Sequence, residues 1–115
     1  MRYLVPLAFG LALTALAPHA HAADCMPAPM MRAAGAAQGF TPAGALEPAD
    51  LARAAALYNS TPPASTDVFD AGELMRHADG RGAILFGRGA DLCVAFVIPA
   101  EHWPQAARLI LGDPT

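Results

Sequence analysis

Two short apolar runs in the second half of the chain constrain its fold more than any other feature. The runs span residues 82–87 and 92–98, contain β-branched and aromatic residues, and are bounded by Gly, Asp and Pro. Runs of this length and composition predict β-strands, and the connection over residues 88–91 predicts a hairpin between them. Neither run alternates polar with apolar residues, so both faces of the sheet need a covering layer.

The segment before the first run, residues 73–78, is compatible with either a strand or a helix. Asp79-Gly80 is a tight-turn signal, which favours a third strand and an antiparallel meander. In the alternative, the residues at 70–73 form a capping box that opens a short helix ending at Gly80. We prefer the strand and keep the helix as the alternative.

Helices are predicted on both sides of these strands. Pro48 suits the first turn of one helix, and Asn59 can cap its end. A second helix begins near His102 and ends at Gly112. The element order predicts a small α+β domain over residues 46–115, a two- to three-stranded antiparallel sheet flanked by an N-terminal and a C-terminal helix. The first helix has one apolar stripe, formed by Leu51, Ala54, Ala55 and Tyr58.

Residues 1–22 have the features of a Sec-type signal peptide. Arg2 supplies a positive N-terminal region, an apolar run follows, and small residues precede a cleavage point between Ala22 and Ala23. The apolar run over residues 3–17 is shorter than the roughly 20 residues of a comfortable membrane span. We therefore expect an exported protein, periplasmic or extracellular, with no stable membrane insertion after signal removal.

Residues 23–45 predict a flexible arm rich in Ala, Pro and Met. Proline and glycine interrupt this stretch repeatedly, and it contains few large apolar side chains. Such a segment offers little surface whose burial would offset the entropy of ordering it.

Two cysteines follow the predicted cleavage point, Cys25 in the arm and Cys93 in the second apolar run. Disulfides persist in the compartments that exported proteins reach, and a bridge of this span contributes about 4 kcal/mol in the chain-entropy model. We predict an intramolecular disulfide. The alternative is a buried and inert Cys93, with Cys25 free or paired to another chain.

The arm also contains a set of soft metal ligands, namely Cys25, Met26, Met30 and Met31. Thiolate and thioether sulfurs select Cu(I). The set lacks a repeated Met spacing and has no nearby histidine that would remain after cleavage, and a disulfide at Cys25 would remove its best ligand. A periplasmic copper-binding protein is therefore the alternative function, and no other cofactor is predicted.

The remaining polar residues do not form a recognisable catalytic motif. His77 and His102 could share a zinc site with a carboxylate, but the spacing of a known zinc motif is missing. Cys93 lies among Val and Phe, surroundings that suppress thiol reactivity even with His102 as a base. The seven basic residues are outnumbered by ten acidic ones, which excludes a basic nucleic-acid footprint. Turns, caps and solvated faces explain the carboxylates Asp67, Asp70, Glu73, Asp79 and Glu101.

The predicted elements do not show what covers the second face of the sheet. Two covering layers are needed, and the chain beyond the signal offers two clear helices, so either the arm or another molecule covers that face. An exposed sheet edge also invites strand addition from a partner. We therefore expect a small exported, non-enzymatic binding or accessory domain, whose sheet associates with a protein partner or with a second copy in a homodimer.

Overall fold

The computed structural model describes residues 25–112, which form three helices and a five-stranded antiparallel sheet. The elements are β1 (Met26–Pro27), α1 (Ala28–Ala37), β2 (Phe40–Ala45), α2 (Pro48–Ser60), β3 (Ala71–His77), β4 (Gly82–Arg88), β5 (Asp91–Ile98) and α3 (Trp103–Leu111). The α+β class is as predicted, but the sheet has more strands than the predicted meander, and a further helix precedes β2. None of the described helices is long and apolar enough to cross a bilayer.

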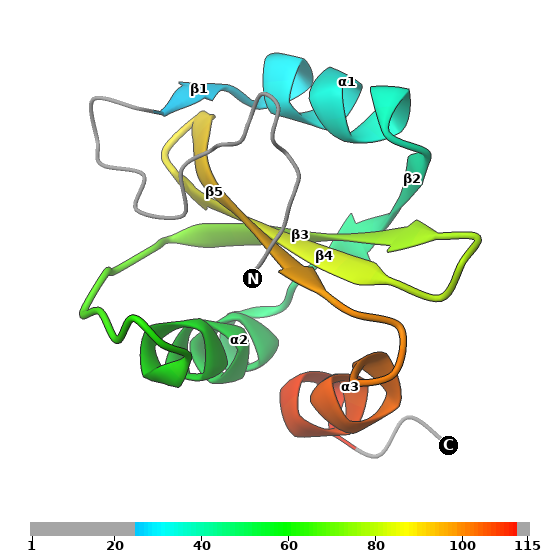
Figure 1. The fold of residues 1–115 in the computed structure, drawn as a ribbon. Coiled ribbons are helices and arrows are strands. Elements are labelled where there is room, and N and C mark those ends of the chain that lie inside the picture. Colours follow the sequence, from blue (N-terminus) through cyan, green and yellow to red (C-terminus); the bar gives the residue numbers. More distant parts are fainter. Residues whose placement is uncertain (1–24, 113–115) are drawn as a thin grey trace.

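The strands lie in the order β1-β5-β4-β3-β2 (Figure 1). The predicted meander is confirmed, because β3, β4 and β5 are consecutive antiparallel neighbours, with Glu73 opposite Leu85. The helix alternative for residues 73–78 is wrong. Asp70, its expected capping residue, instead accepts the backbone N–H of Gly89 at 2.9 Å and so stabilises the turn between β4 and β5.

That turn closes the predicted hairpin between the two apolar runs. Arg88 pairs with Asp91 across a two-residue connection, in which Gly89 adopts a positive φ of 62°. The register shifts next to Gly87, where a side chain would overlap the carbonyl oxygen of Asp91. Glycine is therefore required at position 87 by the close approach of the two strands.

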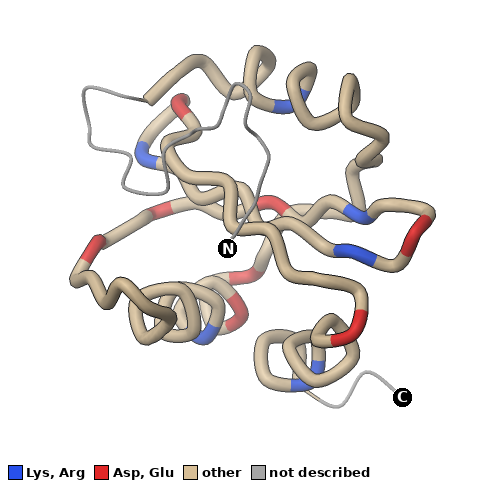
Figure 2. The backbone as a smooth tube through the Cα atoms, in the orientation of Figure 1, with Lys and Arg blue, Asp and Glu red and all other residues tan. Residues whose placement is uncertain are grey.

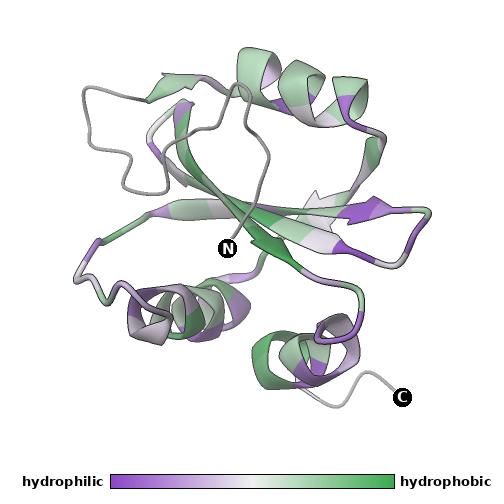
Figure 3. Cartoon of the chain, in the orientation of Figure 1, coloured by the Kyte–Doolittle hydropathy of each residue, from purple (hydrophilic) through white to green (hydrophobic). Residues whose placement is uncertain are grey.

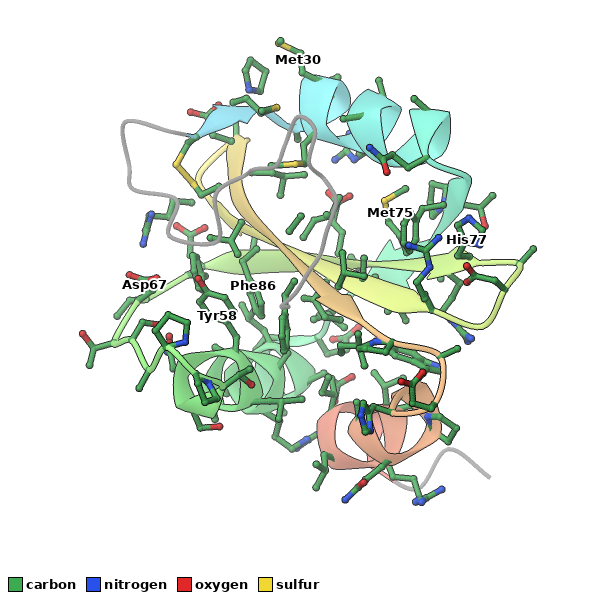
Figure 4. The ribbon with its side chains drawn as sticks, in the orientation of Figure 1. Met30, Tyr58, Asp67, Met75, His77 and Phe86 are labelled. Carbon is green, nitrogen blue, oxygen red and sulfur yellow. A yellow bond between two sulfur atoms is a disulfide. The ribbon has the colours of Figure 1, made fainter. Side chains whose placement is uncertain are left out.

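Helices α2 and α3 cover one face of the sheet (Figure 1). The predicted stripe of α2 faces this core, since Ala54 and Tyr58 are buried and the other two members pack at its margin. Tyr58 lies 5.4 Å from Phe86 between centroids, so the helix is held against the sheet by aromatic contact (Figure 4). Trp103 packs directly on Gly82, and a Cβ at this position would lie 2.4 Å from the indole ring.

Helix α1 covers the other face, and the prediction of a flexible arm over residues 23–45 is wrong for the elements β1, α1 and β2 (Figure 1). Met31 and Gly35 of α1 are buried against the sheet. A Cβ on Gly35 would lie 2.9 Å from the Met75 sulfur, so the small residue allows close approach. Arg32 adds two hydrogen bonds to Glu73 of β3, at 2.8 and 2.6 Å. Small residues thus order this segment by fitting closely against the sheet.

One predicted helix end is also corrected. Helix α2 continues through Ser60, so Asn59 lies inside its last turn and does not cap it. The Asn59 amide instead donates to the carbonyl oxygen of Asp67 at 2.9 Å and accepts the Ser65 hydroxyl at 2.6 Å. The side chain therefore holds the connection between α2 and β3 in place.

Candidate functional site

The sheet has two edges, and the edge formed by β2 is protected against further pairing. Pro42 lacks a backbone N–H, and the register of β2 against β3 shifts between Pro42 and Gly44. Proline and a bulge are common devices that prevent another strand from adding to an edge. Residues 41–45 are exposed to solvent, but the interrupted strand is a poor template for strand addition.

The opposite edge is different, because β1 covers only the first part of β5. Met26 pairs with Leu92 and Pro27 with Asp91, and the pairing ends there. Within residues 25–112 no strand pairs with the outer side of β5 from Cys93 to Ile98. Every second residue of an antiparallel strand directs its N–H and C=O groups to one side, so this length of β5 directs backbone groups away from β4 that no strand within residues 25–112 pairs with.

The side chains of this open edge are apolar, and those in its middle are only partly covered, whereas Cys93, Val94 and Ile98 are buried. Ala95, Phe96 and Val97 are half-buried, whereas the paired residues of β4 are buried. The chain carries no charged residue between Asp91 and Glu101, and its trace is tan over that length in Figure 2. Figure 3 shows β5 as one of the most hydrophobic elements. A long apolar edge without proline or charge is the kind that pairs with another strand.

A disulfide bounds the open edge at its upstream end. Cys25 and Cys93 are bonded, with their Cα atoms 4.0 Å apart, which confirms the predicted intramolecular pairing. Cys93 is buried, and no free thiol is present among the described residues. The bond fixes the start of β1 against β5 and so sets the point at which the covered part of the edge ends.

The predicted copper ligands are not gathered into one coordination sphere. The Cys25 sulfur is used in the disulfide, and Met30 is 59% exposed on the outer side of α1 (Figure 4). Met31 is buried in the apolar cluster beneath α1, and Met26 packs at the margin of that cluster. The fold therefore directs these sulfur atoms to different environments.

The histidine predicted as a zinc ligand instead joins two parts of the fold. His77 Nε2 lies 3.1 Å from the carbonyl oxygen of Gln38, and its Nδ1 lies 3.0 Å from the backbone nitrogen of Asp79. Nδ1 also lies 3.0 Å from Oδ1 of Asp79, so both ring nitrogens have partners within the fold. His102 is exposed at the start of α3. Among residues 25–112 no group of three or more His, Cys, Asp or Glu side chains is arranged to hold a metal ion.

The charged side chains near the β3–β4 turn have structural partners. Desolvation acts to raise the pKa of Asp79, but hydrogen bonds from the backbone and guanidinium of Arg81 at 3.0 and 2.8 Å lower it overall. Arg76 lies 4.6 Å above the Trp103 ring and donates to backbone oxygens of the turn. These groups stabilise the hairpin and its contact with α3.

A second ion pair ties α1 to the sheet. The hydrogen bond from Arg32 lowers the pKa of Glu73, against an opposing effect of desolvation. Two parallel N–H···O contacts make this pair geometrically specific. Because the pair joins α1 to β3, its role is to hold α1 against the sheet.

Comparison of the chain with protein-family models, with curated proteins and with solved structures finds no match. The candidate site therefore rests on the geometry of the described residues. The sequence contains a signal for the open edge, namely the run over residues 92–98 without proline or charge, but it does not indicate that the pairing of β1 ends at Leu92.

Proposed function

We propose that the protein is a small exported, non-enzymatic binding domain that associates with a polypeptide at the open edge of β5. The observation that carries this proposal is the length of β5 beyond Leu92 that no strand of the described residues pairs with. An extended polypeptide that adds there gains main-chain hydrogen bonds, while alternate side chains select the partner.

Helices cover both faces of the sheet, which limits the surfaces at which a partner can bind. The sequence left open whether the arm or a partner covers the second face of the sheet. Helix α1 covers that face, so we place the partner at the open edge of β5 instead. Three large apolar side chains among the described residues are exposed, and they lie apart in the chain: Met30 on α1, Val68 in the connection between α2 and β3, and Leu109 on α3. Isolated exposed apolar residues are ordinary on protein surfaces and do not mark a binding face.

Export is part of the same proposal. The features of residues 1–22 support a cleaved signal, although the predicted cleavage point between Ala22 and Ala23 lies outside the described residues. The disulfide between Cys25 and Cys93 is consistent with an oxidising compartment. Expression of the full chain in a bacterium, followed by N-terminal sequencing of the periplasmic protein, is expected to read Ala23 first. An uncleaved chain retained in the cytoplasm would contradict this part.

Strand addition can be tested with a synthetic probe. The probe is a peptide with the sequence of residues 91–99 and serine in place of the cysteine, titrated into ¹⁵N-labelled mature protein. We expect chemical shift changes concentrated in the amides of residues 94–98. The matched control peptide has the same side chains but carries an N-methyl group at every peptide bond except that before the proline, which removes the backbone donors along both of its edges. Shifts that are absent, that fall elsewhere, or that the control peptide reproduces would refute strand addition at β5.

A further inference from the structure

The position of the open edge in the fold also indicates what occupies it. We infer that a second copy of this chain pairs with β5, antiparallel and about a twofold axis at Phe96. This inference rests on the proposed function, because it names the polypeptide that adds to the β5 edge. The product is a homodimer in which the two five-stranded sheets become one continuous sheet.

The limits of the edge determine the register. The pairing with β1 and the disulfide close the edge up to Cys93, and Pro99 ends the strand after Ile98. The open window is therefore Val94–Ile98, and its midpoint is Phe96. Two identical strands that pair antiparallel about a twofold axis use the whole of this window only when the axis passes through Phe96.

This register brings matching side chains together on both faces. Val94, Phe96 and Ile98 belong to the core beneath α2 and α3, whereas Ala95 and Val97 belong to the cluster beneath α1. A twofold axis perpendicular to the sheet keeps each face on its own side, so apolar residues meet apolar residues in both layers. Ala95 then lies opposite Val97 of the partner subunit, and Val94 lies opposite Ile98 of the partner subunit. The Val94–Ile98 pair is β-branched on both strands, and apolar side chains directly opposite one another stabilise antiparallel sheets.

Phe96 gives the strongest reason for a second copy as the partner. Its ring lies 5.4 Å from Tyr58, in an aromatic group that includes the buried Phe69 and Phe86. Phe96 is the member of this group that stays half-buried, and it lies on the part of β5 that β1 does not cover. On the proposed axis the uncovered side of each Phe96 ring meets the same ring of the partner subunit. Aromatic pairs across strands favour this kind of contact.

Once the proposed signal is removed, the chain before Cys25 is too short to occupy the whole window instead. If cleavage follows Ala22, only Ala23 and Asp24 precede Cys25. Extending the register of β1 by those two residues reaches no further than Ala95. Phe96, Val97 and Ile98 would remain open, and these include the residue on the proposed axis.

Sedimentation equilibrium of the mature protein tests the inference, with Ala95→Lys as the disruptive variant. We expect the wild type to dimerise reversibly. Ala95→Lys should raise the dimer Kd by more than about tenfold, because the twofold axis introduces a lysine from each of the two subunits into the interface. The matched control is Ala43→Lys, an exposed position on the β2 edge, which should leave the Kd unchanged. Circular dichroism and thermal unfolding establish that both variants are folded.

A second measurement on the wild type makes the result independent of any variant. In a mixture of ¹³C-labelled and unlabelled protein, isotope-filtered spectra should show contacts between Val94 methyl groups of one subunit and Ile98 methyl groups of the other. A monomer at all accessible concentrations would overturn the inference. So would a dimer that Ala95→Lys leaves intact, or intermolecular contacts in another register. If the protein is monomeric but the probe peptide still shifts residues 94–98, the homodimer fails and the proposed function stands.

Discussion

Loss of the Cys25–Cys93 disulfide should destabilise this domain by a large fraction of its total stability. The two cysteines are 68 residues apart in sequence, and the loop they close contains α1, β2, α2, β3 and β4. In the chain-entropy model, a loop of this length corresponds to about 4 kcal/mol at room temperature. Domains of this size are stable by about 5–15 kcal/mol in total, so the double variant Cys25→Ala/Cys93→Ala should lie near the limit of folding.

Urea unfolding followed by the fluorescence of Trp103 measures this loss. Trp103 is the only tryptophan of the chain, and it is buried where α3 meets the sheet. We expect the midpoint to fall and the m-value to rise, because an unfolded chain without the cross-link exposes more surface. The protein concentration must be constant, since association would add to the apparent stability.

Reduction of the wild-type protein during the same titration provides the control. Both cysteine side chains then remain in place, so a cavity at the buried Cys93 does not contribute. The reduced wild type and the double variant should lose similar free energies, with the variant losing slightly more. If the free energy of unfolding falls by less than about 1 kcal/mol in both proteins, the disulfide does not stabilise the domain by constraining the unfolded chain. That result would refute the prediction.

Three further substitutions test the packing of the two layers. Ile84→Ala removes a fully buried side chain and should cost about 2–5 kcal/mol in urea unfolding, and a cost like that of a surface position would contradict the assigned core. Gly82→Ala forces a methyl group against the tryptophan on α3 and should cost about 1–3 kcal/mol, with a shift in tryptophan emission as the accompanying signal. Arg32→Gln should lower stability at neutral pH but not in strong acid. Because the folded-state pKa of Glu73 is lowered, its contribution is present above its unfolded pKa and lost as the pH falls through the folded value. Unfolding curves over an acidic pH series check this, and a difference between variant and wild type that does not shrink with falling pH would contradict it.

The strands of the meander could be predicted because their signals are local. The apolar runs at 82–87 and 92–98 form β4 and β5, and the turn signal at Asp79-Gly80 separates β3 from β4. A buried strand needs apolar residues over its own length, and a tight turn needs its own residue types, wherever the rest of the chain lies. The cysteine pairing was predictable for a similar reason, since only two cysteines follow the predicted cleavage point.

Helix α1 and strand β2 were missed because their stability comes from other parts of the chain. Gly35 and the alanines around it have little apolar surface of their own, and their composition indicates an unstructured segment. Met75 packs directly against Gly35, and Glu73 binds Arg32. Residues about 40 positions away in the sequence therefore supply the contacts that hold α1 in place. Local composition contains no information on such contacts.

The sequence by itself determined the α+β class, the meander, two of the three helices and the cysteine pairing, because each depends on the periodicity, turn chemistry or count of nearby residues. Only the tertiary structure decided which face α1 covers and where the edge of the sheet stays open. Strand β1 begins at Met26, which pairs with Leu92, and this leaves Val94–Ile98 without a neighbouring strand among the described residues. An edge is a property of strand order, and strand order is set by packing between distant segments rather than by the residues of the edge strand itself.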